Sequence, residues 1–200
     1  MNYLVVGLGN IGFEYIDTRH NIGFSTLDAW AQASNVSFST MRYGDVAEIR
    51  IKGHCITLLK PSTYMNLSGK AVSYWVQKLK LSLSNLLVIS DDMALPIGTL
   101  RLKKQGSSGG HNGLQNITDM LGTQQWARLR IGIGSHFGFG TQIDFVLGKW
   151  TPEEKQEIDE AIPRAIEGIK SFITIGPDRA MNTINTKQKP LPPQETETAE

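Results

Sequence analysis

The sequence has few of the features that assign a chain to a specialised class of protein. Its single cysteine, Cys55, excludes a disulfide within the chain, and the apolar run around it indicates a buried thiol in a strand. No apolar run approaches the length of about 20 residues that a transmembrane helix needs, and the first residues lack the basic start of a secretory signal. We therefore expect a cytoplasmic protein with no membrane partner.

The chain also lacks an excess of charge of either sign. Its 20 lysine and arginine residues are matched by 19 aspartate and glutamate residues, so the net charge is +1. A polyanion such as a nucleic acid would have to bind a local basic patch. The histidines, at 20, 54, 111 and 136, show none of the short spacings that are typical of metal sites. Neither a metal nor another cofactor is expected.

Apolar runs and helical spacings alternate along the 200 residues, and the chain is long enough for one sizeable core. Strands are predicted at 3–8, 46–51, 54–59, 86–89, 100–102 and 129–133, and helices within 18–34, 68–80, 113–121, 151–173 and 180–184. The turn Lys52-Gly53 predicts a hairpin, so the sheet is not purely parallel. We expect an α/β fold with a single domain over residues 1–186, in which a twisted mixed β-sheet is flanked by helices on both faces. A disordered tail rich in Pro, Glu and Thr follows at 187–200.

Two glycine patterns suggest other functions. Gly7-x-Gly9-x-x-Gly12 follows the first strand and matches a dinucleotide-binding fingerprint, but no helix opens at these glycines and no acidic residue ends a second strand about 20 residues on. Gly106-Ser-Ser108-Gly-Gly110 matches a nucleophile elbow, but the preceding Lys103-Lys104-Gln105 is a poor match for a buried central strand. A serine hydrolase that uses Ser108 stays an alternative.

A third feature is a set of polar side chains beside glycines at the predicted strand ends, where open α/β folds bind their ligands. The set consists of Asn10, His20, Asn21, Asn66, Asp91, His111 and Asn112. Each of them alone is explained as a turn, cap or loop residue. Together, a histidine, a carboxylate that can orient it and several neutral amide donors suit the hydrolysis of an ester.

Several short blocks, read in order, are similar to those of a known enzyme family. They are Gly7-Leu-Gly-Asn10, Thr18-Arg-His-Asn21-x-Gly23, Lys60-Pro-x-Thr-Tyr-Met-Asn66-x-Ser-Gly69, Gly109-Gly-His-Asn-Gly-Leu114 and Leu129-Arg-Ile-Gly-Ile-Gly134. Through these blocks the chain resembles the bacterial-type peptidyl-tRNA hydrolases from residue 4 to about 185. The resemblance implies a monomeric, metal-independent α/β enzyme. Such an enzyme hydrolyses the ester between the peptide and the 3′-terminal ribose of peptidyl-tRNA, and so recycles tRNA from prematurely released peptidyl-tRNA.

The resemblance assigns the chemistry to a histidine and a carboxylate. His20 matches the general base that acts on water, and Asp91 matches the carboxylate that supports it, with Asp92 as the competing candidate. A carboxylate bonded to one imidazole nitrogen fixes the tautomer and favours the imidazolium that forms. Asn66 and Asn112 match amides that contact the substrate or hold the developing oxyanion.

The remaining site residues follow from the same resemblance. Asn10, which we count with the catalytic residues, matches the residue that contacts the 3′-terminal CCA of the acceptor end and distinguishes blocked from unblocked aminoacyl groups. His111 matches a mobile gate in a glycine-rich loop. The walls of the cleft are assigned to Tyr15, Tyr64 and Met65. Apart from the resemblance, the basic residues near these blocks are candidates for contacts to the backbone of the acceptor stem, namely Lys103, Lys104, Arg128 and Arg130. Arg130, in a central strand, has the alternative of being a paired structural arginine.

The chain departs from the family pattern at three places. Ile11 stands where the family usually has proline, and Ala94 stands where an aspartate is common. The segment Ser135-His-Phe-Gly-Phe-Gly140 replaces a proline-glycine turn followed by lysines, so we expect weaker phosphate attraction and weaker salt dependence. A catalytically inactive RNA-binding relative with the same fold is a second alternative, although the retained His20, Asp91, Asn66 and Asn112 argue against it.

Overall fold

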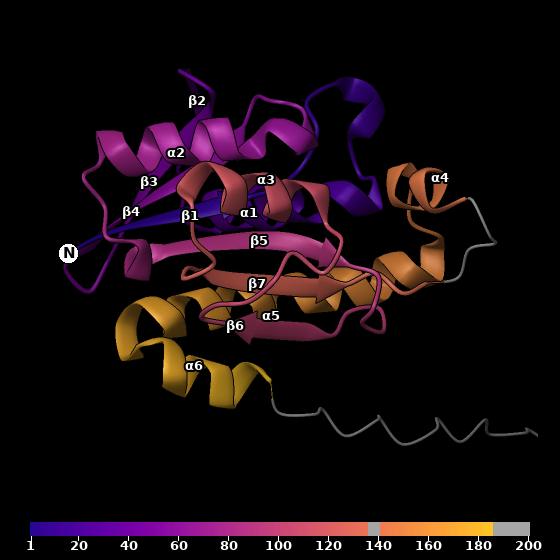
Figure 1. Cartoon of the computed structure of the whole chain (residues 1–200). Coiled ribbons are helices and arrows are strands. Elements are labelled where there is room, and N and C mark those ends of the chain that lie inside the picture. The colour runs from indigo at the N-terminus through magenta and orange to yellow at the C-terminus, as the bar shows by residue number, and fades with distance from the viewer. Residues whose placement is uncertain (136–140, 186–200) are drawn as a thin grey trace, which may run out of the picture.

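A mixed sheet of seven strands forms the centre of the computed structural model, which describes residues 1–135 and 141–185 (Figure 1). The strands are β1 (Asn2–Gly7), β2 (Ser39–Met41), β3 (Gly44–Ile51), β4 (His54–Pro61), β5 (Leu86–Asp92), β6 (Leu100–Lys103) and β7 (Ala127–Gly132). Their order across the sheet is β2-β3-β4-β1-β5-β7-β6. The strands β4, β1, β5 and β7 run parallel, whereas β2, β3 and β6 pair in antiparallel fashion. The predicted mixed sheet is confirmed.

Helices cover both faces of this sheet, as predicted (Figure 1). They are α1 (Ile22–Ala33), α2 (Ser68–Lys78), α3 (Asn112–Leu121), α4 (Gln142–Leu147), α5 (Pro152–Ile175) and α6 (Pro177–Ile184). On one face, α2 and α3 pack over a core that includes Leu4 and Trp75. On the other, α1, α5 and α6 pack over a core that includes Val5, Trp30 and Phe172. Leu4 and Val5 belong to different cores because successive residues of a strand point to opposite faces.

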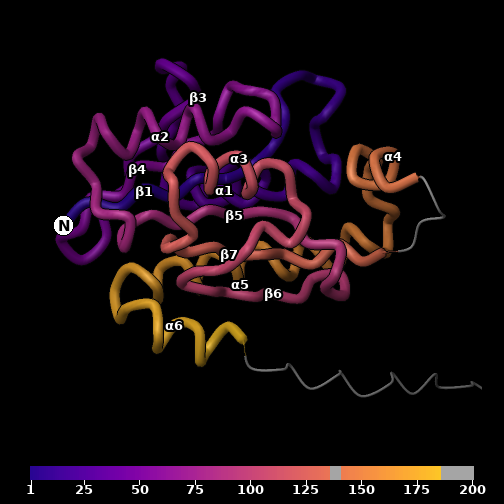
Figure 2. Tube along the Cα trace, viewed as in Figure 1, coloured from indigo at the N-terminus to yellow at the C-terminus, as the bar shows by residue number. Residues whose placement is uncertain are grey.

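The carboxyl ends of the four parallel strands meet at one edge of the sheet, which lies beside α4 in Figures 1 and 2. Three short 3-10 helices follow strands at this edge: η1 (Phe13–Tyr15), η2 (Arg19–Asn21) and η3 (Met65–Leu67). A fourth, η4 (Leu83–Asn85), precedes β5 at the opposite edge. Polar side chains from the first edge are therefore brought together from distant parts of the sequence.

Local sequence signals explain two of the connections. Lys52 and Gly53 join β3 to β4 with φ angles of 47° and 81°, which is the left-handed pair that a tight hairpin turn requires. At the start of α5, the hydroxyl of Thr151 accepts from the backbone N–H of Glu154, and the carboxylate of Glu154 accepts from the backbone N–H of Thr151. Both the hairpin and this reciprocal cap were predicted.

Other features differ from the prediction. β5 extends to Asp92, so Asp91 and its neighbour are strand residues and point to opposite sides. The strand β2 and the helix α4 were not predicted, because the three residues of β2 are all exposed and α4 buries only Val146. The predicted tail at 187–200 lies outside the described residues. None of the helices within residues 1–135 and 141–185 is long and apolar enough to cross a membrane.

Candidate active site

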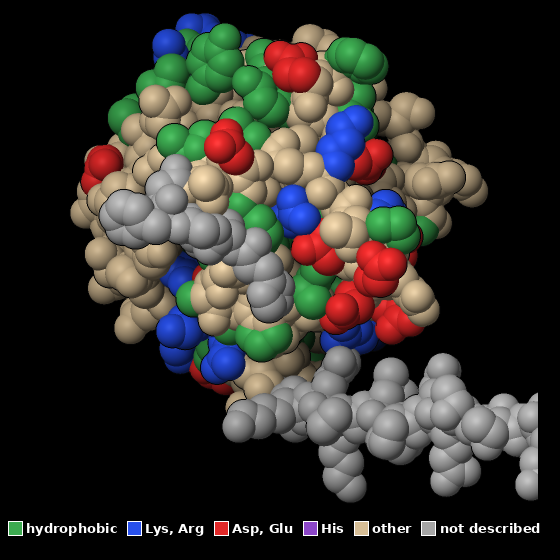
Figure 3. Space-filling model, turned by 90° about the vertical axis from the view of Figure 1, so that its right-hand side faces the viewer, with side chains coloured by type: hydrophobic (Ala, Val, Ile, Leu, Met, Phe, Trp, Pro, Cys, Tyr) green, Lys and Arg blue, Asp and Glu red, His purple; other side chains and the backbone are tan. Residues whose placement is uncertain are grey.

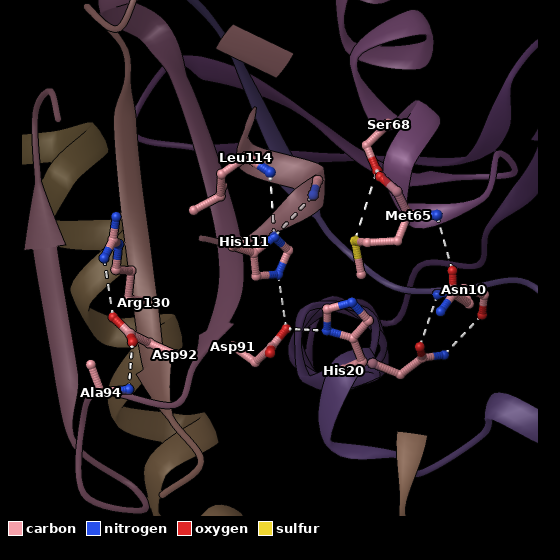
Figure 4. Close-up of polar contacts among 12 residues, drawn as sticks. Asn10, His20, Met65, Ser68, Asp91, Asp92, Ala94, His111, Leu114 and Arg130 are labelled. Atoms are coloured by element: carbon pink, nitrogen blue, oxygen red, sulfur yellow. Dashed lines mark hydrogen bonds and ion pairs between the residues drawn. The ribbon is translucent and has the colours of Figure 1, made fainter. Parts of the chain in front are cut away.

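Asn10 joins three segments at the carboxyl edge of the sheet (Figure 4). Its backbone N–H donates to Oδ1 of Asn21 at 2.8 Å, and Nδ2 of Asn21 donates back to the carbonyl of Asn10 at 2.9 Å. Its side-chain Oδ1 accepts from the backbone N–H of Met65 at 3.0 Å. Within residues 1–135 and 141–185, Nδ2 of Asn10 has no hydrogen-bond partner. Asn10 is therefore fixed by its oxygen and keeps a donor for a ligand.

His20 and Asp91 form a hydrogen-bonded pair at the same edge. Nδ1 of His20 lies 2.8 Å from Oδ1 of Asp91, and the His20 side chain is 13% exposed. An ionised carboxylate accepts only, so Nδ1 carries the proton and donates it to Asp91. Nε2 of His20 is then the unprotonated nitrogen, which is the state that a general base requires.

The two groups shift each other's titration. Burial by itself lowers the pKa of His20, but the charge of Asp91 and its hydrogen bond outweigh burial, so the pKa is raised from its ordinary value of 6.5. Burial by itself raises the pKa of Asp91, but the interactions with His111 and His20 outweigh it and hold that pKa well below its ordinary value. Asp91 is therefore ionised throughout the neutral range.

His111 is bound at both of its ring nitrogens. Nδ1 accepts from the backbone N–H groups of Gly113 and Leu114 at 3.1 and 3.3 Å, and so caps α3. Nε2 lies 3.0 Å from Oδ1 of Asp91, the oxygen that also accepts from His20. A nitrogen that accepts two N–H groups carries no proton, so the proton of neutral His111 lies on Nε2. Sequence reasoning missed this cap, because histidine is not a usual capping residue.

His20, Asp91 and His111 also form a cluster whose ligand atoms lie within 4.8 Å of one another. The hydrogen bonds of His111 do not suit a metal ion there. A metal at Nε2 would move the proton to Nδ1, where it would face two N–H donors at the start of α3. The cluster is better suited to proton transfer than to metal binding.

Asp92 has a different set of partners, which decides between the two candidate carboxylates. Its Oδ2 lies 3.2 Å from Nη1 of Arg130, and its Oδ1 accepts from the backbone N–H of Ala94 at 2.8 Å (Figure 4). Asp91, and not Asp92, is therefore the carboxylate that contacts His20.

Two arginines of β7 hold the glycine-rich loop that leads to His111. The carbonyl of Ser107 accepts from Nη1 of Arg128 at 3.0 Å and from Nη2 of Arg130 at 2.6 Å. Arg128 is completely buried and stacks on Trp126, and burial, together with the charge of Arg130, lowers the pKa of Arg128 to about 10. Arg128 is therefore a structural residue, and the prediction that it contacts tRNA is wrong.

The serine-hydrolase alternative does not fit this loop. The hydroxyl of Ser108 donates to Oε1 of Gln115 at 2.9 Å. The nearest imidazole in sequence, His111, already uses both of its nitrogens for α3 and Asp91. Ser108 therefore lacks the adjacent base that an activated serine needs.

Only some of the other predicted site residues line the cavity. A cavity beside the two histidines is lined by Asn112 and Arg130 among others, whereas Lys103 is not part of its wall. Lys103 pairs with the start of β7, about 10 Å along the strand from the edge that holds His20 and Asp91. Met65 is buried and lies behind the surface, while Tyr15 is half-buried. Tyr64, Asn66 and Asn112 are exposed, and neither carboxamide has a hydrogen-bond partner among the described residues.

Arg19 is a site-supporting residue that sequence reasoning missed. It directly precedes His20 and is 7% exposed. Its guanidinium donates to Glu154 at 2.6 Å and to the carbonyl of Phe145 at 3.2 Å, and it lies over the Phe145 ring. Arg19 thus ties η2 to α4, whose residue Ile143 lines the cavity. A buried arginine gives no signal in sequence, because its partners lie more than 100 residues away.

Comparison with known proteins places this geometry in a family. The family model of the peptidyl-tRNA hydrolases matches residues 4–192. The chain belongs to the peptidyl-tRNA hydrolase family. A peptidyl-tRNA hydrolase of Cytophaga hutchinsonii is 53% identical over 188 residues, covering 94% of this chain and 100% of the relative. One from Bacteroides fragilis is 57% identical over 187 residues, covering 94% and 100%.

Solved peptidyl-tRNA hydrolases have the same fold as this chain. A crystal structure from Acinetobacter baumannii superposes with a TM-score of 0.88 at 35% identity and covers 93% of this chain and 95% of that one. A peptidyl-tRNA hydrolase solved with N-propanol gives the same TM-score at 36% identity, covering 94% and 96%. Family membership confirms the predicted class, a hydrolase that acts on an ester bond, and does not support the serine-hydrolase or inactive RNA-binding alternatives.

Proposed function

We propose that this peptidyl-tRNA hydrolase uses His20 as the general base on a water molecule that attacks the ester of peptidyl-tRNA. The observation that carries the proposal is the 2.8 Å bond between Nδ1 of His20 and Asp91, which leaves Nε2 unprotonated beside a cavity. The raised pKa of His20 makes it a stronger base than free imidazole.

In the proposed reaction, water supplies both the hydroxyl group of the released acid and the proton of the leaving ribose oxygen. Water attacks the ester carbonyl carbon while Nε2 of His20 takes one of its protons, so that a tetrahedral oxyanion and an imidazolium form. Asp91 stabilises the imidazolium through its existing bond to Nδ1. Collapse of the tetrahedral species breaks the bond to the ribose oxygen, which receives the proton from Nε2 and leaves as the terminal hydroxyl of the tRNA.

Neutral amides supply the donors for the substrate in this proposal. Nδ2 of Asn10 has no partner in the described part of the chain, and Asn112 lies in the cavity wall next to His111. Asn66 is exposed one residue after Met65, whose N–H is held by Asn10. Donors that are placed in advance stabilise an oxyanion without reorganisation, and loss of one such donor typically lowers the rate by about 10²–10³.

Apolar side chains surround the same end of the molecule. Figure 3 looks onto this end, where hydrophobic side chains gather on part of the surface and acidic side chains on another. Phe13 is 87% exposed, Ile143 71% and Tyr64 64%. We assign this surface, with Tyr15, to the peptide and the terminal nucleotides of the acceptor end, because aromatic faces bind both apolar side chains and unstacked bases.

The basic surface that is available to bind the tRNA backbone is small. Lys103 is exposed, but Lys104 is paired with Asp178 and Arg130 with Asp92. The replaced basic segment at 135–140 falls mostly outside the described residues. We propose that the enzyme acts in the cytoplasm as a monomer, and that tRNA release from an N-blocked aminoacyl-tRNA shows a shallow dependence on salt.

One assay separates the hypotheses. Wild-type protein should release tRNA from an N-blocked aminoacyl-tRNA, and His20→Ala should lose most of this activity while it keeps its thermal stability and binding. The matched control is Ser108→Ala, which removes the competing nucleophile and should leave turnover nearly intact. Normal turnover by His20→Ala would refute the mechanism, and binding without any turnover by the wild type would indicate an inactive relative.

A further inference from the structure

The side chain of His111 connects the start of α3 to the carboxylate behind the proposed base (Figure 4). The backbone N–H groups of Gly113 and Leu114 hold its Nδ1, so its Nε2–H points at Oδ1 of Asp91. The His111 side chain is 8% exposed, and its ring centroid lies 5.0 Å from that of His20. His111 is therefore fixed as a donor without a net charge.

Both imidazoles donate to the same oxygen atom. Nδ1 of His20 is 2.8 Å and Nε2 of His111 is 3.0 Å from Oδ1 of Asp91. Two donors on one carboxylate oxygen compete for its electron density, so each hydrogen bond is weaker than it would be alone. The same two donors fix the carboxylate in one orientation, because rotation of Asp91 would leave a buried polar hydrogen without a partner.

We propose that His111 is a positioning residue, which holds Asp91 in place and moderates its pull on the proton of His20, so that the strength of the base depends on the glycine-rich loop. His111 ends that loop, which begins with the carbonyl of Ser107 held by Arg128 and Arg130. The inference rests on the proposed function in taking His20 as the base.

Few other charged groups face the carboxylate. Among the described residues that line the cavity, Asp92 and Arg130 are the only further ionisable side chains, and they neutralise each other in their own ion pair. A change in the titration of His20 after substitution of His111 would therefore report on Asp91.

The substitution His111→Asn separates the two roles of the histidine. Asparagine is a good helix N-cap, but it is too short to reach Asp91, so His111→Asn should keep α3 and lose the contact. Without the second donor, Asp91 binds the imidazolium of His20 more strongly. The acid limb of kcat/KM should then move to higher pH by about 0.5–1 unit, the size expected for a partial change in one hydrogen bond. We also expect kcat to fall more than KM changes.

Two further variants test whether the effect is only structural. His111→Ala removes both contacts, so it should show the same movement of the limb and a melting temperature lower by roughly 2–4 °C. His54→Asn removes a half-buried histidine of β4 whose ring packs against Tyr3, far from the cavity, and should leave the limb in place. A purely structural role of His111 would lower activity without moving the limb.

An NMR titration of the histidine ring protons gives a readout that does not depend on activity. The signal of His20, assigned by its loss in His20→Ala, should titrate at higher pH in His111→Asn than in the wild type. An unchanged or lower value would overturn the inference. Failure of the proposed function can be distinguished from failure of this inference. An active His20→Ala variant would refute the role of His20 as general base. The comparison of the His20 titration between the wild type and His111→Asn would remain valid in that case.

Discussion

The two ends of the Asn10 carboxamide can be perturbed separately. Its Oδ1 accepts from the backbone N–H of Met65 at 3.0 Å, whereas its Nδ2 has no partner in residues 1–135 and 141–185. Asn10→Asp keeps an oxygen for Met65 and removes the donor, while Asn10→Ala removes both. We expect the aspartate variant to fold like the wild type and lose activity, and the alanine variant to lose both activity and stability.

The magnitudes follow from the burial of this contact. Asn10 is 9% exposed and Met65 is 5% exposed, so alanine leaves a buried N–H group without an acceptor. An unsatisfied buried donor costs about 1–3 kcal/mol, and each kcal/mol lowers the melting temperature of a chain of this size by about 2–4 °C. A carboxylate accepts the same bond at least as well, so Asn10→Asp should melt close to the wild type. Loss of the donor should lower kcat/KM by about 10²–10³.

Thermal melts and tRNA release from an N-blocked aminoacyl-tRNA check both expectations. Asn116 gives a matched control, because its Oδ1 accepts from the backbone N–H of Gly69 at 2.8 Å between α3 and α2. Asn116→Ala should lower the melting temperature, and Asn116→Asp should retain full activity. If Asn10→Asp were as active as the wild type, Nδ2 of Asn10 would not be a substrate donor and its place in the mechanism would be wrong.

Three further outcomes are expected. Asp91→Asn should lower kcat by about 10³–10⁴, since an amide cannot fix the His20 tautomer, and stopped activity assays over pH 5–9 would show this loss across the range. In the wild type, kcat/KM should rise with pH through a midpoint above 6.5, because Asp91 raises the pKa of His20 and the base works only when it is deprotonated; a midpoint below 6.5 would contradict this. Gly109→Ala should destabilise the protein by about 1–2 kcal/mol in a denaturant titration, because φ is +61° there and the new Cβ would lie 2.8 Å from Nη1 of Arg130.

Those parts of the fold that depend on neighbours in sequence were predictable. The apolar run of β1 and the turn at Lys52-Gly53 predicted a central strand and the β3–β4 hairpin of the sheet, and Thr151-Pro-Glu-Glu154 predicted the start of α5. The helix α4 was not predictable. Its stability comes from contacts with Arg19 across more than 100 residues, and it is too short to show a period of its own.

The site was predictable as a set of residue types and not as a geometry. His20 and Asn10 lie in the blocks that carry the family resemblance, Asp91 was singled out at the end of a predicted strand, and the structure brings all three to one edge of the sheet. The sequence could not show that His111 caps α3 and shares the oxygen of Asp91, because both facts depend on how the glycine-rich loop folds. It likewise could not separate buried Arg128 from the half-buried Arg130 two residues later.

The last residues of β5 show why the arrangement needs both aspartates in this order. Successive residues of a strand point to opposite sides, so Asp91 meets the imidazoles while Asp92 meets Arg130. Arg130 and the imidazoles each have a carboxylate of their own, so neither group competes for the partner of the other. Asp92 also accepts from the backbone N–H of Ala94, which closes the turn after the strand. Loss of Asp92 should therefore leave Arg130 without its ion-pair partner and the turn after β5 without this hydrogen bond.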